Sequence, residues 1–171
     1  MNLHRSHETS RDEKEQRQAQ NTAIEVRSAR SADIPELCDL LADLFEIEAA
    51  FAINPERQAN GLRLLLEDGS GRSNVFVAED GGRVIGMCSV QVTISTAEGR
   101  PTAIMEDLVV RREHRRSGVG TALVEAAGEW CLKRGITRLQ LLADRKNSRA
   151  LAFYSSRGWG GTNLICLRKR L

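Results

Sequence analysis

The sequence predicts a mixed α/β domain, in which one β-sheet carries helices on both faces. The first observation is the order of the elements: strand, two helices, three strands, helix, strand, helix, strand. The second is that glycine-containing turns separate the central strands, which is typical of antiparallel hairpins. The third is size, because 171 residues suffice for one ordinary domain with its own core but not for two comfortable ones.

The first strand and helix are indicated by two different periodicities. Residues 24–27 alternate apolar and polar side chains, which is typical of a half-buried strand. Ser31 and Asp33 then offer oxygens for a helix N-cap, and Pro35 suits the first turn. The apolar positions that follow recur with the spacing of one helix face and are Leu37, Leu40, Leu41, Leu44 and Phe45.

A second helix and an antiparallel meander are expected next. The helix begins after Asn54-Pro55 and runs toward Asp68, where a Gly-Ser-Gly turn ends it. Strands are predicted at residues 75–78, 84–96 and 103–110. Between the first two of them, an Asp-Gly-Gly turn supplies the positive φ angles that a tight hairpin needs.

The second half of the chain predicts alternating helices and strands. Residues 119–131 carry a helical apolar stripe, and Gly135 suits the position just past that helix. The largely apolar residues 139–143 predict a strand in the centre of the sheet. Residues 147–157 predict a short helix that buries Ala150, Leu151, Phe153 and Tyr154, and residues 164–167 predict a last strand.

Composition excludes several classes of protein. Residues 1–22 are polar and of mixed charge, so we expect a disordered tail before a domain at residues 23–171. No apolar stretch approaches the roughly 20 residues that span a bilayer, so no membrane partner is expected. A net charge of +2 is too small to indicate nucleic-acid binding by itself.

The cysteines favour a reducing compartment. They are far apart, form no CxxC pair and lie in apolar sequence, which predicts buried thiols rather than a metal site. His114 has no cysteine near it. We therefore expect a cytoplasmic protein without a metal, in which four thiols are unpaired: Cys38, Cys88, Cys131 and Cys166.

One junction in the sequence predicts an anion site. A strand ending at Val110 runs into a basic loop that opens a helix, and the unpaired N–H groups at a helix start bind anions. Gly118 and Gly120 lack Cβ atoms, so a phosphate can approach the backbone, and Arg115 and Arg116 add positive charge.

The loop matches one of three phosphate-binding patterns. GxxxxGK[ST] is absent, and GxGxxG fails because Leu123 occupies the third glycine position. What remains is Arg-x-x-Gly-x-Gly at residues 115–120. This loop resembles the pyrophosphate-binding motif of the GNAT N-acetyltransferases. Asn147, followed by a Phe-Tyr pair and by Gly-Trp ending at Trp159, resembles the second cofactor motif of that family. The resemblance covers residues 104–159.

The resemblance implies a fold detail and a co-substrate, acetyl-coenzyme A (acetyl-CoA). In this family the parallel strands on either side of the loop splay apart, and pantetheine lies in the gap. The backbone of Leu108, Val109 and Val110 would hold the pantetheine and acetyl group, with the Leu108 N–H polarising the acetyl carbonyl. Asn147 would contact the pantetheine arm. The pyrophosphate would be held by the N–H groups of Arg116, Ser117, Gly118, Val119, Gly120 and Thr121, beside Arg115.

The resemblance also implies two catalytic roles. Tyr154 would be the general acid, since a phenol with a pKa near about 10 can return a proton to a thiolate; the alternative is a packed aromatic. The amine must lose a proton first, and Glu106 and Asp107, adjacent on a strand, should point to opposite faces. We favour Glu106 as the base, acting through a water, with Asp107 structural; a mechanism without a base stays open.

Four questions stay open from the sequence. A catalytically silent acetyl-CoA sensor or scaffold would share the same motifs. The basic run at residues 111–116 would suit nucleic acid, but no aromatic residues are interleaved for stacking. The acceptor, a small-molecule or peptide amine, should be selected by residues 31–68, where Glu46 and Glu48 are candidates, and by the loop before the last strand. Family members often pair through edge strands, which leaves a homodimer open.

Overall fold

The computed structural model describes residues 24–47 and 53–169, which form one five-stranded sheet with flanking helices. The predicted tail at residues 1–22 lies outside the described residues. The elements in chain order are β1 (Glu25–Ser28), η1 (Ser31–Asp33), α2 (Ile34–Ile47), α3 (Pro55–Leu66), β2 (Ser73–Asp80), β3 (Arg83–Ser95), β4 (Arg100–Val110), η2 (Arg112–His114), α4 (Val119–Leu132), β5 (Leu139–Gln140) and α5 (Ser148–Ser155).

The sheet is antiparallel except at one edge. Strands β1 to β4 are neighbours in sequence order and antiparallel, as the glycine turns predict. β5 pairs parallel with β4 only through Ala103 opposite Leu139 and Ile104 opposite Gln140. Because β4 continues to Val110 without β5 beside it, the two strands diverge. The predicted mixed sheet with a splayed parallel pair is therefore confirmed.

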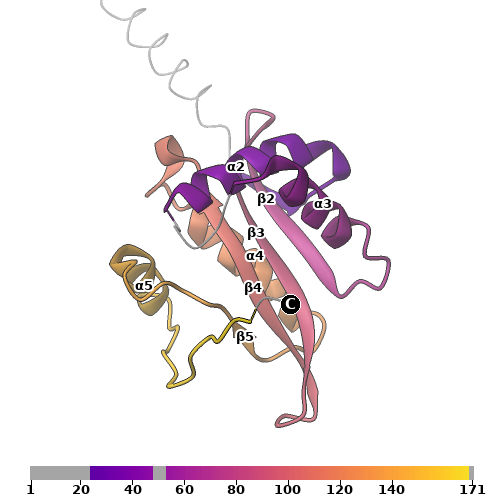
Figure 1. Ribbon diagram of the computed structural model, residues 1–171, viewed down its shortest axis with the longest axis vertical. Coiled ribbons are helices and arrows are strands. Elements are labelled where there is room, and N and C mark those ends of the chain that lie inside the picture. Colours follow the sequence, from indigo (N-terminus) through magenta and orange to yellow (C-terminus); the bar gives the residue numbers. More distant parts are fainter. Residues whose placement is uncertain (1–23, 48–52, 170–171) are drawn as a thin grey trace, which may run out of the picture.

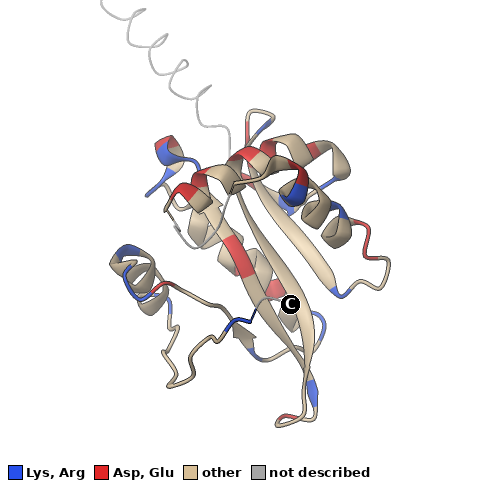
Figure 2. Cartoon of the chain, in the orientation of Figure 1, with Lys and Arg blue, Asp and Glu red and all other residues tan. Residues whose placement is uncertain are grey.

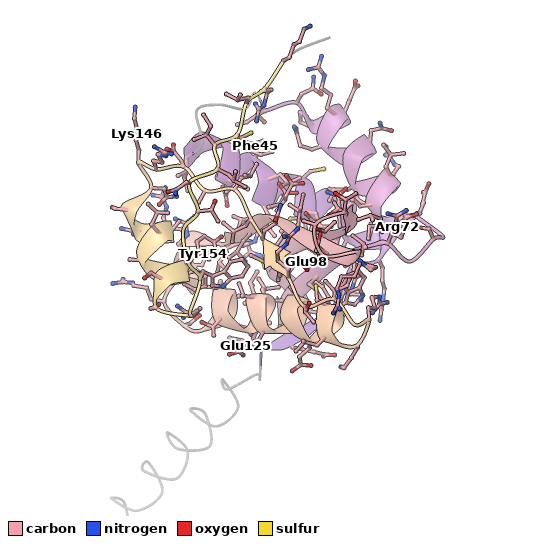
Figure 3. All side chains as sticks on the ribbon, turned by 90° about the horizontal axis from the view of Figure 1, so that it is seen from below. Phe45, Arg72, Glu98, Glu125, Lys146 and Tyr154 are labelled. Carbon is pink, nitrogen blue, oxygen red and sulfur yellow. The ribbon has the colours of Figure 1, made fainter. Side chains whose placement is uncertain are left out.

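Helices cover both faces of the sheet, which also confirms the prediction. α4 lies on one face, where Leu123 and Ala127 pack with Met105 of β4. α2 and α3 lie on the opposite face, where Leu40 packs in a cluster with Val77 of β2. The view along the sheet shows α4 on one side and the helix pair α2 and α3 on the other (Figure 3).

Local signals explain where the elements begin. The Asn54 side chain accepts a 3.0 Å hydrogen bond from the Arg57 N–H, and Pro55 occupies the first turn of α3. Gly81 and Gly82 have φ angles of 56° and 81°, as the β2–β3 turn requires. These residues act as the sequence predicts.

Asp33 caps the helix start as predicted, but from the third residue of η1, and it has a second role. Its carboxylate accepts a 2.7 Å hydrogen bond from the Arg30 N–H and forms an ion pair with Arg27 at 2.8 Å. Arg27 also forms an ion pair with Glu79 on β2. Hydrogen bonding from Arg27 holds the pKa of Asp33 below its usual value. The side chain therefore ties β1 and β2 to the turn before α2.

The predictions for the C-terminal part were wrong in three respects. The expected central strand 139–143 is reduced to two residues at the sheet edge, and Leu142 is 67% exposed. Residues 164–167 form no strand, and Leu164 is 85% exposed. α5 buries no residue completely: Leu151 is exposed, while Phe153 and Tyr154 are half-buried. An apolar run forms a strand only where a neighbouring strand supplies hydrogen bonds, and the described residues after α5 form an irregular segment without strand pairing (Figure 1).

Candidate active site

A bulge in β4 brings two carboxylates to one face. Met87 pairs with Val109 and Ser89 with Glu106, so Cys88 of β3 opposes two residues of β4. One of those two is Asp107, with a left-handed φ of 55°. The prediction that Glu106 and Asp107 point to opposite faces was wrong, because both line the same pocket. An extra residue breaks the alternation on which that prediction rested.

Two polar residues of β3 orient these carboxylates. Gln91 donates a 3.0 Å bond to Glu106, and buried Ser89 donates a 3.1 Å bond to Asp107. The two donors are two residues apart on β3, so they share a face. That spacing was a signal available in the sequence that our reading missed.

The pocket lies between the sheet and the helix pair α2 and α3. Its volume is about 540 Å³. Figure 2 shows the acidic stretch of β4 in the middle of the sheet, beside these helices. Apolar side chains of α2 and α3 form one wall and are Leu41, Phe45, Leu62, Leu64 and Leu65; the polar lining includes Gln58, Asp68, Arg72, Ser73, Gln91, Glu106 and Asp107.

The start of α4 has the backbone form of an anion site. Gly118 is the N-cap with a left-handed φ of 93°, and no side chain caps this helix start. Arg116, two residues earlier, is also left-handed with a φ of 68°. A Cβ at Gly118 would meet nothing within 4 Å, so the approach to the helix start is open on that side. Such an end offers N–H groups to an anion.

The arginines around the loop divide into two pairs. Arg111 and Arg115 donate through Nε to the carbonyls of Val84 and Val110, at 3.0 and 2.9 Å. The Arg111 side chain is therefore tied to β3 and is not only solvated. Arg112 and Arg116 are exposed. Two of the four guanidinium groups thus already donate hydrogen bonds to backbone carbonyls. This weakens the alternative that the basic run binds nucleic acid.

Glu46, the candidate acceptor residue on α2, does not line the large pocket. Glu46 lines a separate hollow of about 160 Å³ with Arg112 and Arg115. Glu48 lies outside the described residues. Gln58 of α3 and Asp68, two residues past the end of that helix, line the large pocket and were not predicted.

α5 contacts the start of α4 through residues of both predicted motifs. A Cβ at Gly120 would lie 3.5 Å from the Phe153 ring. Arg157 stacks on that ring at 3.9 Å and donates through Nε to Thr121 Oγ1 at 3.1 Å. The sequence reasoning missed Arg157, although its position one helical turn after Phe153 is visible in the sequence.

The other predicted loop residues have structural contacts. Ser117 Oγ donates a 2.6 Å bond to the carbonyl of His114, and the Val119 side chain is buried in the core. On β4, Val109 is buried while Leu108 and Val110 are half-buried. The assignment of their backbone groups to a cofactor stays a prediction.

Tyr154 lies on α5, on the side toward the sheet (Figure 3). Its ring is half-buried between Phe153 and Trp159, with centroids 5.3 and 5.6 Å away. Tyr154 is outside the set of residues that lines the pocket with Glu106. Asn147 Oδ1 accepts a 3.0 Å bond from the Ala150 N–H and so caps α5. Their roles toward a cofactor also stay predictions.

None of the helices in the described part of the chain is long and apolar enough to cross a membrane. Within the same residues, no group of three His, Cys, Asp or Glu side chains is placed to hold a metal ion.

Proteins similar to this chain include several acetyltransferases. An uncharacterized N-acetyltransferase of Archaeoglobus fulgidus is 27% identical over 78% of this chain and 90% of its own. The thialysine N-epsilon-acetyltransferase of Bos taurus is 26% identical, over 79% and 83%. The aminoglycoside antibiotic 6'-N-acetyltransferase of Acinetobacter haemolyticus has a similar fold, with a TM-score of 0.72 and 20% identity over 86% of this chain and 98% of that one.

Other matches are partial: the chain spans 18% of an acetyl transferase of Oryza sativa and 38% of an uncharacterized N-acetyltransferase of Methanocaldococcus jannaschii. The model of the acetyltransferase (GNAT) family matches residues 34–159, from the first residue of α2 to just past α5. This chain belongs to the GNAT acetyltransferase family.

Proposed function

We propose that this protein transfers an acetyl group from acetyl-CoA to a primary amine. The observation that carries the proposal is the juxtaposition of three features. β4 diverges from β5, the uncapped start of α4 lies at the end of β4, and α5 packs against that start through Phe153 and Arg157. Names of relatives, among them an N-epsilon-acetyltransferase and an aminoglycoside acetyltransferase, support the reaction class.

The chain offers a binding group for each part of the co-substrate. The N–H groups from Arg116 to Thr121 would hold the pyrophosphate, with Arg115 and exposed Arg116 adding positive charge. The open edge of β4 from Leu108 to Val110 would bind the pantetheine arm, helped by Asn147. The Leu108 N–H would stabilise the oxyanion that forms on the acetyl carbonyl.

Proton transfer is assigned to two side chains. The amine nitrogen must lose a proton before it attacks, and Glu106, hydrogen-bonded by Gln91, would take it through a water. The new C–N bond forms as the C–S bond breaks, and Tyr154 would give a proton to the departing thiolate. Asp107 shares the pocket with Glu106, so it is the alternative base.

Binding of acetyl-CoA is the first test. Isothermal titration should give a micromolar-range Kd for the parent and a large loss for Gly120→Asp, which places a negative charge at the helix start. Gly120→Ala is the matched control, because a Cβ there makes only ordinary contact with Phe153. If the parent binds nothing, the proposal fails; a salt-sensitive binding of DNA or RNA that ignores acetyl-CoA would favour the nucleic-acid alternative.

Turnover separates an enzyme from a sensor. With any accepted amine, Tyr154→Phe should lower kcat by about 100-fold or more in a thiol-release assay, while the Kd for acetyl-CoA is unchanged. The Phe ring keeps the packing on Phe153 and Trp159. Unchanged kcat would leave Tyr154 as a packed aromatic. Tight acetyl-CoA binding without turnover on a broad amine panel would favour the sensor.

A further inference from the structure

The 540 Å³ pocket has different charges at its two ends and an apolar wall between them. From this arrangement, and resting on the proposed function, we infer the class of acceptor. We propose that the acceptor is a free α-amino acid whose aliphatic side chain ends in a primary amine, of which lysine is the common example.

The reacting end of the pocket is acidic. Glu106 and Asp107 both line it, and each accepts one hydrogen bond from β3, from Gln91 and Ser89. A carboxylate has two oxygens and several lone pairs, so Glu106 can accept from a ligand as well as from Gln91. This end therefore suits the side-chain amine.

The far end of the pocket carries both signs of charge. Asp68 is held by hydrogen bonds from Ser70 Oγ and Ser73 Oγ, at 2.6 and 3.1 Å. Those bonds, led by the one from the Ser70 hydroxyl, lower the pKa of Asp68, so it is ionised at neutral pH. Arg72 lines the same end, and the described residues give it no ion pair within 4.0 Å. A carboxylate beside a guanidinium is complementary to the ammonium and carboxylate of an amino acid.

The distance between the two ends fits a short chain. Ser73, which bonds Asp68, pairs with Gln91, and Gln91 pairs with Ile104, two residues before Glu106. With strands about 4.8 Å apart and about 3.3 Å per residue, the Cα atoms of Ser73 and Glu106 are about 12 Å apart. Side chains and two charge-assisted hydrogen bonds of about 2.8 Å take up part of that span. The remaining span is short and suits a ligand with a short aliphatic chain between its charged ends.

The wall between the ends matches the aliphatic part of such a ligand. Phe45 and Leu41 of α2 and Leu62 and Leu65 of α3 line it. Methylene groups gain free energy when such side chains cover them, whereas a ligand with hydroxyl groups along its length would leave them unpaired there. The wall thus selects against a sugar-like amine and in favour of an alkyl chain.

Three ligands separate the contributions of the α-carboxylate and the α-ammonium to binding. L-lysine carries both, cadaverine (1,5-diaminopentane) lacks the carboxylate, and 6-aminohexanoate lacks the α-amine. Titrated into the full-length protein with coenzyme A present, which cannot react, lysine should bind about tenfold more tightly than either analogue. Titrations without coenzyme A and kcat/KM values with acetyl-CoA should give the same order.

Two variants assign the charges to residues. Arg72→Gln should reduce lysine to the affinity of cadaverine and leave cadaverine unchanged. Asp68→Asn should reduce lysine to the affinity of 6-aminohexanoate and leave that ligand unchanged. Arg63→Gln is the control, since Arg63 is exposed on α3 and does not line the pocket.

The inference is overturned if lysine does not bind, if either analogue binds as tightly as lysine, or if the variants weaken all three ligands equally. Failure of the proposed function looks different: acetyl-CoA is neither bound nor consumed, whatever the lysine titrations without coenzyme A show. Acetylation of an aminoglycoside in preference to lysine would uphold the proposed function and reject this acceptor class.

Discussion

The sheet with α2, α3 and α4 differs sharply from the part of the chain after β5. In the first region two buried clusters lie on opposite faces of the sheet, and both include fully buried leucines such as Leu40 and Leu123. In the second, α5 has no buried residue, and Leu164 and Leu167 are each 85% exposed. Figure 1 shows α5 at the margin of the layers, where Phe153 and Tyr154 are partly buried and pack against the cluster on the α4 side of the sheet.

This difference in packing matters because the two proposed catalytic residues lie in different regions. Glu106 sits on the rigidly packed β4, whereas Tyr154 sits on a helix that meets α4 through a few side chains. Segments with few buried contacts open more easily than the core. Such a helix can adjust around a co-substrate while the acceptor pocket keeps its shape. Four predictions test this contrast, from the largest expected effect to the smallest.

A core leucine and an exposed one should differ most. Leu40→Ala should lower the free energy of unfolding by about 3 to 4 kcal/mol, because it leaves a cavity under α2. Leu164→Ala should change it by less than about 0.5 kcal/mol, since the side chain is exposed. Urea unfolding followed by the fluorescence of Trp130, a core residue, and Trp159 measures both. A similar loss for the two variants would show that the C-terminal segment is packed after all.

The Arg27–Asp33 ion pair should contribute next. Asp33→Asn leaves a half-buried guanidinium with one partner fewer and should cost about 2 to 3 kcal/mol. The folded pKa of Asp33 is lowered by Arg27, so its stabilisation is full above the unfolded pKa near about 4 and is lost as pH falls through the lower folded value.

Unfolding free energies of parent and Asp33→Asn, measured from pH 7 downward, should therefore converge only in strong acid. Glu129→Gln removes an exposed pair with Lys133 and should change stability by less than about 1 kcal/mol at any pH. A parent–variant gap that is already small at pH 7 would contradict the assigned role of Asp33.

Loosening α5 should have a local effect. Arg157→Met removes the hydrogen bond to Thr121 and the stacking on Phe153, so amide hydrogen exchange in α5 should be faster by about tenfold. Exchange in α4 and the unfolding free energy should stay nearly unchanged. Arg149→Met, also exposed on α5, is the control. If both variants changed amide exchange in α5 equally, Arg157 would not be the residue that ties α5 to α4.

Thiol labelling should distinguish the regions without perturbing them. Burial raises the pKa of Cys88 to about 12, and burial also raises the pKa of Cys131. Cys166 is exposed. Iodoacetamide at pH 8 should therefore label Cys166 first in the folded protein, as read by peptide mass mapping. Labelling of Cys88 at the same rate would mean that the core opens readily.

Much of the fold followed from periodicity and turn chemistry. The helical stripe of α2, the cap at Asn54 and the glycines of the β2–β3 turn act locally, so neighbouring residues suffice to predict them. The prediction of buried thiols was correct for Cys88 and Cys131, wrong for Cys166, and Cys38 is half-buried. The prediction for Cys166 was wrong because it assumed a strand at residues 164–167. That strand needed a neighbouring strand to pair with, which the sequence does not identify.

By itself, the sequence determined the layered α/β order, the family and the glycine loop at the start of α4, because each depends on residues close together along the chain. The tertiary structure decided which carboxylates meet. A bulge at Asp107 turns it to the side of Glu106, and the packing of α2 and α3 adds Asp68 and Arg72 to the same pocket. A bulge depends on how two strands pair, and long-range packing depends on where helices dock. Residue spacing along a single strand predicts neither the bulge nor the packing.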